Sequence, residues 1–154
     1  MLTQTSVTAI RLLLNLGQVP NQTVTLKEVA RQLHVSPTYL VKVAGHLIRA
    51  DIVQAVRGQR GGVVLKRPPA TITLHDIVVA CQGAIKGDYC RYTTKRSHTC
   101  AFHQAGAELQ EAIVGVLQRW TLADFLRQPC PTGSFRSQLP CVLQFGHYTN
   151  GKAA

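Results

Sequence analysis

The feature that most constrains the fold of this 154-residue chain is a pair of short helical patterns with only a few residues between them. The apolar residues of the first pattern have the spacing of one helix face: Leu26, Val29, Ala30 and Leu33. Thr25-x-x-Glu28 in front of them is a capping-box pattern, and we expect this helix to end near His34. The second pattern begins at Ser36, a good N-cap residue, and has a proline at its first helical position. Two helices this close together predict a helix-turn-helix.

The second helix of the pair has two different faces. Its predicted core stripe consists of Leu40, Ala44, Leu47 and Ile48. The opposite, polar face is expected to hold Tyr39, Lys42, His46 and Arg49. Two β-branched runs follow at 52–56 and 63–66, joined by a glycine-rich turn that contains Arg57 and Arg60. This order predicts a mainly α-helical fold with a small β-hairpin wing, which is a winged helix-turn-helix.

The charge of the chain indicates the kind of partner. There are 17 Lys and Arg against 7 Asp and Glu, a formal net charge of +10. Residues 1–70 carry nine of the basic and two of the acidic residues, so we expect the polyanion-binding surface in this half. We therefore predict binding to double-stranded DNA through the second helix and the wing. The candidate contact residues are Ser36, Thr38, Tyr39, Lys42, Arg49, Arg57, Arg60 and Gly61.

The remaining patterns predict further helices around this unit. Apolar residues at helical spacing predict a first helix with Gly17 as its C-terminal stop. Thr73-x-x-Asp76 predicts a capped helix, in which Cys81 lies on the core face as a small hydrophobic residue. A long apolar stripe follows, made of Leu109, Ala112, Ile113, Val116, Leu117 and Trp120. A stripe of this length suits the dimerisation helix of a homodimer.

These patterns divide the chain into three parts. We expect a winged helix-turn-helix DNA-binding domain at 1–70, a sensor loop with the dimerisation helix at 71–127, and a partly irregular tail at 128–154. No stretch approaches the roughly 20 apolar residues of a membrane span and no export signal is recognisable, so we expect a cytoplasmic protein. Neither a nucleotide-binding glycine pattern nor paired acidic residues indicate an enzyme. We assign no role to Cys130 and Cys141 in the tail.

The segment 35–68 resembles a known family. Its sequence, VSPTYLVKVAGHLIRADIVQAVRGQRGGVVLKRP, and WTLADFL at 120–126 are similar to the winged-helix bacterial regulators that include the iron–sulfur regulator IscR and the nitric-oxide regulator NsrR. The resemblance is strongest in the pattern Arg57-Gly58-x-x-Gly61-Gly62-x-x-Leu65-x-Arg67-Pro68, and it covers residues 1 to about 127. It implies a homodimeric transcription regulator, which we expect to be a repressor. The resemblance also implies a pseudo-palindromic operator, with the recognition helix in the major groove and the wing arginine in the minor groove.

The loop before the long helix contains the candidate sensor site. Members of the resembling family that carry a two-iron two-sulfur cluster have three cysteines there, and IscR-like members add a histidine three residues after the last one. Cys90, Cys100 and His103 match the first cysteine, the last cysteine and this histidine, whereas the middle cysteine is absent. The resemblance therefore implies a [2Fe–2S] cluster on these three ligands. Each iron takes two protein ligands, so the fourth would come from His98 or from another residue such as the partner subunit's His34.

The residues themselves leave other possibilities open. A Cys2His2 set also suits zinc, although nine residues between the cysteines is not the spacing of a common zinc finger. In the absence of a metal, cysteines near Arg91, Lys95 and Arg96 are candidates for a thiol oxidation switch. The last alternative is a DNA-binding module without a cofactor, or one that acts by binding a protein partner such as a biosynthetic enzyme.

Overall fold

The computed structural model describes residues 2–58, 61–86 and 100–127. The α-helices in these ranges are α1 (Gln4–Gln18), α2 (Leu26–Leu33), α3 (Pro37–Arg49), α4 (Leu74–Gln82), α5 (Ala101–Arg119) and α6 (Leu122–Arg127). Strands β1 (Val53–Val56) and β2 (Gly62–Leu65) form an antiparallel hairpin, and a 3₁₀ turn, η1 (Pro69–Thr71), leads from the hairpin to α4. The predicted mainly α-helical fold with a small hairpin is confirmed.

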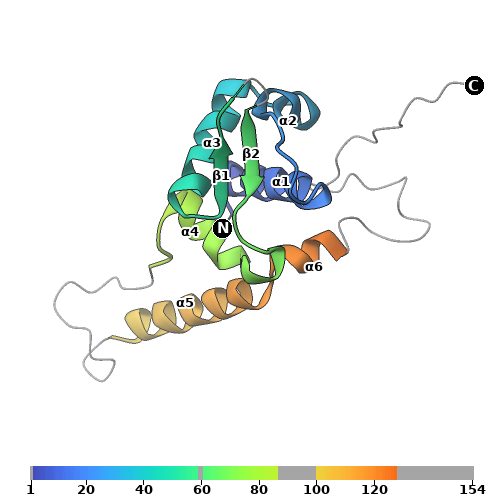
Figure 1. Ribbon diagram of the computed structural model, residues 1–154. Helices are drawn as coiled ribbons and strands as arrows, with labels where there is room; N and C mark the ends of the chain where they lie inside the picture. Colours follow the sequence, from blue (N-terminus) through green and yellow to red (C-terminus); the bar gives the residue numbers. More distant parts are fainter. Residues whose placement is uncertain (1, 59–60, 87–99, 128–154) are drawn as a thin grey trace, which may run out of the picture.

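Helix α1 lies in the middle of the molecule, and the other elements surround it (Figure 1). Helix α2, the start of α3 and the turn of the hairpin lie together at one end. Helix α5 runs along the opposite end, where α4 and α6 connect it to the rest. The two candidate functional regions are therefore on opposite sides of a shared core.

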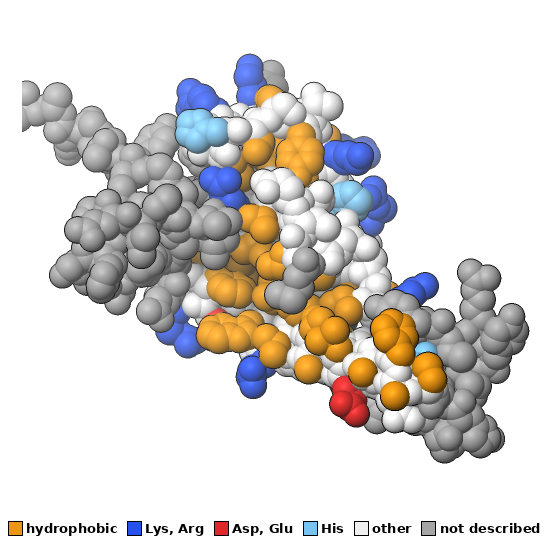
Figure 2. All heavy atoms as spheres, turned by 180° about the vertical axis from the view of Figure 1, so that it is seen from behind, with side chains coloured by type: hydrophobic (Ala, Val, Ile, Leu, Met, Phe, Trp, Pro, Cys, Tyr) orange, Lys and Arg blue, Asp and Glu red, His pale blue; other side chains and the backbone are white. Residues whose placement is uncertain are grey.

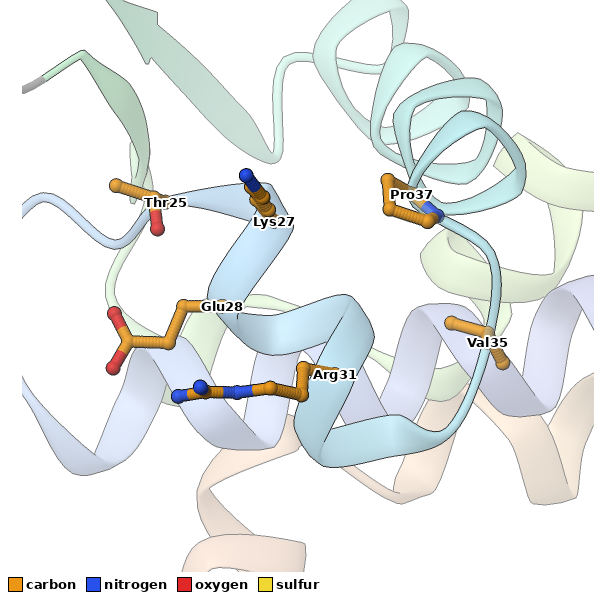
Figure 3. A pocket seen from close by; sticks show the side chains of 6 residues that line it. All are labelled: Thr25, Lys27, Glu28, Arg31, Val35 and Pro37. Atoms are coloured by element: carbon orange, nitrogen blue, oxygen red, sulfur yellow. The ribbon is translucent and has the colours of Figure 1, made fainter.

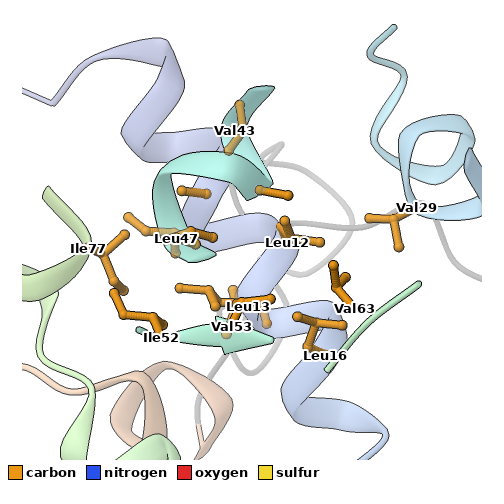
Figure 4. Packing of buried hydrophobic residues seen from close by; sticks show 14 of the residues in the cluster. Leu12, Leu13, Leu16, Val29, Val43, Leu47, Ile52, Val53, Val63 and Ile77 are labelled. Carbon is orange, nitrogen blue, oxygen red and sulfur yellow. The ribbon is translucent and has the colours of Figure 1, made fainter. Parts of the chain in front are cut away.

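The core forms around the apolar residues of α1. Leu12, Leu13 and Leu14 have no exposed surface, and Leu16 is only 2% exposed. Figure 4 shows side chains from α3, from both strands and from α4 that converge on this helix. Complete burial of a leucine contributes roughly 1.5–3 kcal/mol to stability, so each of these four residues helps to hold the surrounding elements against α1.

The turn between α2 and α3 has the predicted caps at α3 but not at α2. The Ser36 hydroxyl accepts a hydrogen bond from the Tyr39 N–H at 3.1 Å, and Pro37 is the first residue of α3. Helix α2 ends at Leu33, and the C-cap residue His34 has a left-handed φ of 55°, close to the predicted end of the helix. The prediction of a capping box at the start of α2 is wrong, because the Thr25 side chain makes no capping hydrogen bond. Its backbone carbonyl instead accepts the Glu28 and Val29 N–H groups, at 3.1 and 3.2 Å.

The core stripe of α3 differs from the prediction by one residue. Leu40, Val43, Ala44 and Leu47 are buried, whereas Ile48 is 37% exposed. The four buried residues follow i, i+3, i+4 and i+7, a single helix face. Ile48 lies on the edge of this face, and Val43 takes its place because α3 packs against α1, α2 and α4.

The sequence predicted Gly17 as the C-terminal stop of α1, but this prediction is wrong. The helix continues to Gln18, and the Val19 N–H, which follows it, donates to the Leu16 carbonyl at 3.3 Å. A Cβ atom at Gly17 would lie 2.6 Å from the Cδ1 atom of Leu126 in α6. The glycine therefore permits a close contact between α1 and α6.

The segment around Thr121 ties the end of α5 to the start of α4. The Leu74 N–H donates to the Trp120 carbonyl and the Leu122 N–H donates to the Ile72 carbonyl, both at 2.8 Å. The predicted capping box of Thr73 and Asp76 is present at the start of α4. Arg67 donates to the Asp76 carboxylate at 3.1 Å, which fixes the chain as it leaves the hairpin.

A second cap begins α6. The Thr121 hydroxyl donates to the Asp124 carboxylate at 2.7 Å, and the Thr121 N–H donates to the same oxygen at 2.9 Å. These two hydrogen bonds lower the pKa of Asp124, and the one from the hydroxyl has the larger effect. The WTLADFL segment thus acts as a structural clamp between α4, α5 and α6.

The hairpin is attached to the core through Gly62. Val24 pairs with Val63 by two backbone hydrogen bonds of 3.0 and 2.9 Å, which brings its carbonyl over the start of β2. A Cβ atom at Gly62 would lie 2.2 Å from the Val24 carbonyl oxygen. Only glycine allows this approach, because the obstructing atom belongs to the backbone.

We predict that Gly62→Ala destabilises the protein by roughly 1–3 kcal/mol, since overpacking forces the strand away from Val24. Gly45→Ala is the matched control, because its Cβ atom would meet only the end of Arg49 at 3.6 Å. Alanine in a helix interior is favoured over glycine by up to about 1 kcal/mol, so this variant should be as stable as the parent or more stable. Urea denaturation followed by circular dichroism measures both. Equal midpoints for Gly62→Ala and the parent would contradict this account of the hairpin.

Candidate nucleic-acid interface and sensor loop

The N-cap and the outer side of α3 carry four of the eight predicted contact residues. Ser36, Thr38, Lys42 and Arg49 are all exposed. The Arg49 guanidinium contacts the Nδ1 atom of His46 at 3.1 Å. A guanidinium only donates hydrogen bonds, so Nδ1 must be the acceptor in this arrangement. His46 therefore holds Arg49 against the helix.

Tyr39 has a different environment from the other candidates. Its side chain is half-buried and packs against the core. Its hydroxyl group donates to the Thr5 hydroxyl of α1 at 3.4 Å. The structure therefore gives Tyr39 a packing role, and its predicted contact with DNA stays a prediction.

The wing presents one described arginine. Arg57 is exposed directly after β1, whereas Arg60 lies outside the described residues. Gly58 has a φ of 129°, and its carbonyl accepts the Gly61 N–H at 2.9 Å. A Cβ atom at Gly61 would lie 2.9 Å from both the Gly58 and the Val56 carbonyl oxygens. Gly61 is thus required for the turn itself. The sequence predicted it only as a DNA-contact residue.

The basic end of the molecule also has a hollow. Figure 2 shows Lys and Arg side chains around the end opposite to α5. A hollow of about 430 Å³ lies between α2 and the start of α3, and Figure 3 shows Lys27 and Pro37 on its two sides. Its lining is Thr25, Lys27, Glu28, Arg31, Val35 and Pro37. The mixture of charges favours no particular ligand, but the hollow leaves the first turn of α3 accessible.

Helix α5 has a large exposed apolar face. Phe102 is 72% exposed, Leu109 62%, Val116 46% and Trp120 47%. Figure 2 shows hydrophobic side chains gathered along this end of the molecule. The face contains Leu109, Val116 and Trp120 of the stripe predicted from the sequence. Exposed apolar surface of this kind is typical of an interaction site.

The start of α5 holds the described residues of the predicted sensor site. Cys100 is the N-cap residue of α5 and is exposed, and His103 follows one helical turn later and is 8% exposed. Cys90 and His98 lie outside the described residues. Among residues 2–58, 61–86 and 100–127, no group of three or more potential metal ligands lies together. His34 is the C-cap residue of α2, and α2 and α5 of the same chain lie at opposite ends of the molecule (Figure 1).

Cys81 is separate from this site. It is half-buried in α4 and packs against the core, in agreement with the small hydrophobic role predicted for it. Burial raises the pKa of its thiol to about 11. Cys81 therefore stays protonated at neutral pH and is a poor nucleophile.

The described helices do not include one that is both long and apolar enough to span a lipid bilayer. The arrangement of α2, α3 and the hairpin, with basic residues on the outer side, defines a winged helix-turn-helix protein of the DNA-binding class. The sequence profile of the Rrf2 family, described as "Iron-dependent Transcriptional regulator", matches residues 2–128. The chain belongs to this family of DNA-binding transcription regulators.

Individual relatives agree with this assignment. Protein aau3 of Rhizobium meliloti is 30% identical over 123 residues, which cover 77% of this chain and 80% of that protein. The structure is similar to that of T. potens IscR, with a TM-score of 0.67 and 26% identity over 82% of this chain and 86% of the other. CymR, the global cysteine regulator of B. subtilis, has the same fold, with a TM-score of 0.68 and 23% identity over 82% of this chain and 96% of the other.

Proposed function

We propose that this chain is a homodimeric repressor that binds a pseudo-palindromic operator and whose affinity is set by the loop in front of α5. The observation that carries the proposal is the separation of two surfaces. An exposed basic helix and wing lie at one end of the molecule, and an exposed apolar helix lies at the other. The first surface suits DNA and the second suits another copy of the chain.

The DNA contacts follow from the exposed side chains of α3 and the hairpin. Residues at the start of a recognition helix meet phosphates and base edges in the major groove. Lys42, an exposed cation on α3, is assigned to a phosphate. Arg57, exposed at the base of the wing turn, is assigned to the adjacent minor groove.

We predict that Lys42→Ala weakens binding to specific and random duplexes alike and reduces the salt slope by about one. Arg57→Ala should instead reduce the preference for A·T-rich flanks, because a narrow minor groove attracts an inserted arginine. Lys86→Ala, which removes an exposed cation after α4, is the control and should retain both properties. The measurement is fluorescence anisotropy with a selected operator at several salt concentrations. Parental binding by both test variants would refute the assignment of this surface.

The apolar face of α5 is assigned to the dimer interface. Its exposed side chains are large, and leaving them in water is costly at roughly 25 cal/mol per Å². Two-fold symmetry brings the same face of each subunit together, and the two basic ends then meet successive half-sites.

We predict that Val116→Glu converts the dimer into a monomer, because it places a charge on each side of the apolar interface. Gln118→Glu, on the exposed polar side of the same helix, adds the same charge and should leave the dimer intact. Sedimentation velocity distinguishes the two species at micromolar concentration. A monomeric parent protein would remove the basis for this interface, and so would an unchanged dimer in Val116→Glu.

The sensor site is assigned to Cys100 and His103, together with Cys90. The thiol of Cys100 and the imidazole of His103 are donors of the kind that a [2Fe–2S] cluster accepts, and they lie one helical turn apart. Their donor types and their spacing in the sequence suit two ligands of one iron. The family description as iron-dependent regulators supports this group. When bound, such a cluster supplies one-electron redox chemistry and a rigid link between its ligands.

The protein's own residues provide the coupling to DNA. Helix α5 begins at the proposed site and ends at the clamp around Thr121, which is bonded to the core that α3 shares. A fixed orientation of α5 would set the distance between the two recognition helices. Coupling energies between such sites are typically about 1–3 kcal/mol.

We predict that protein prepared without oxygen contains iron and sulfide and absorbs in the visible range. Cys100→Ala and His103→Ala should lose most of the iron, whereas Cys81→Ala, which removes a protonated thiol away from the site, should retain it. A colourless, iron-free parent protein after reconstitution would refute the cluster. Unchanged iron in Cys100→Ala would refute the ligand assignment.

A thiol switch is the second candidate function, because Cys100 is exposed at the end of a long helix. It requires the same loop but no metal. Iron-free protein whose DNA affinity changes on mild peroxide treatment, and is restored by a thiol reductant, would favour it.

A further inference from the structure

Helix α3 has a second stripe of residues that mirrors its core stripe. The buried stripe is Leu40, Val43, Ala44 and Leu47. The residues with the same i, i+3, i+4, i+7 spacing on the outer side are Thr38, Val41, Lys42 and Gly45. Recognition helices use residues at this spacing to reach base edges, because they form one face that can enter the major groove.

Val41 is the unexpected member of the outer stripe. It is 55% exposed and is the most exposed large hydrophobic residue among the described parts of the helix-turn-helix and wing. Its neighbour on the stripe, Gly45, has no side chain, and a Cβ atom there would meet only Arg49 at 3.6 Å. A partner can therefore approach the helix backbone closely beside Val41.

We propose that Val41 contacts the C5-methyl group of a thymine in each half-site, and this inference rests on the proposed DNA-binding function. The methyl group distinguishes an A·T pair in the major groove and is recognised by apolar side chains. A branched apolar side chain in the second turn of the recognition helix, beside the phosphate-binding Lys42, has this chemistry. Val41 thus specifies sequence, whereas Lys42 contributes affinity.

The charge around Val41 favours DNA over a second copy of the protein. Helix α3 contains Lys42 and Arg49 but no acidic residue. Two copies of this face would repel each other, whereas the same cations attract a phosphate backbone. DNA is therefore the occupant that satisfies both the apolar and the basic groups of the surface.

Single thymine-to-deoxyuridine replacements test this inference, since each removes one methyl group and leaves base pairing intact. In a selected operator, the parent protein should lose affinity at one symmetric pair of positions, by roughly fourfold for each methyl group that is no longer buried. Val41→Ala should bind the thymine operator more weakly and should be indifferent to deoxyuridine at that pair. Ile48→Ala, which shortens the other exposed apolar side chain of α3, should show the parental profile.

The outcomes separate this inference from the function on which it rests. A parent protein that binds no selected duplex would contradict the DNA-binding proposal itself. A parent that binds its operator but has no methyl-sensitive position would overturn the thymine contact alone. The same conclusion follows if Val41→Ala retains the full parental profile, or if it changes only the sedimentation coefficient. If Ile48→Ala became insensitive to deoxyuridine at the same pair of positions, the methyl contact would belong to Ile48, and its assignment to Val41 would be overturned.

Discussion

The burial of helix α1 is the interaction on which the rest of the structure depends. Its leucines are enclosed by α2 and α3 on the side of the wing, and by α4 and α6 on the side of the long helix. Ile72, Ile77 and Leu122 belong to the same cluster as Leu40 and Leu47 of α3. The proposed DNA-binding surface and the base of α5 are therefore parts of one packed body, and packed interiors transmit displacement because they contain few voids. The proposed division at residue 70 describes function and does not separate two cores.

The same core determines how the loop before α5 can act. The loop follows Gln82, the last residue of α4. The Gln82 side chain accepts hydrogen bonds from the Ser6 hydroxyl at 2.9 Å and from the Thr3 N–H at 3.2 Å. Helix α5 is attached again where Gln110 donates to the Ile85 carbonyl at 2.8 Å. Helix α4 is anchored to α1 by the hydrogen bonds of Gln82, so we expect a change in the loop to act mainly on the direction of α5. Helix α5 is the element that carries the proposed dimer interface.

The sequence predicted most of the helices because their signals are local. Ser36 and Thr73 form caps within one turn, and such contacts do not depend on the rest of the chain. The predicted capping box at Thr25 was wrong although its signal is equally local, whereas other features depend on a distant segment. Gly17 resembles a helix stop but contacts Leu126, and Gly62 is required by Val24 across the hairpin. Val41 was overlooked because an isolated valine in a helix gives no sign of its exposure until the core stripe of α3 is known. The ligand set of the sensor site also depends on contacts between distant residues and subunits, so the sequence provides candidates without their geometry.

In the proposed dimer, the positions of the two proposed surfaces would allow a small chain to couple its loop to DNA binding. Each recognition helix lies at the far end of its subunit from α5 (Figure 1). A small rotation of one α5 against the other is therefore amplified into a larger displacement between the two α3 helices, because the displacement grows with distance from the axis. The operator tolerates little of this displacement, since half-sites repeat with the helical turn of roughly 34 Å. In the proposed dimer, control of affinity would thus require a change in the angle at which the two subunits meet and no change within the proposed DNA-binding surface.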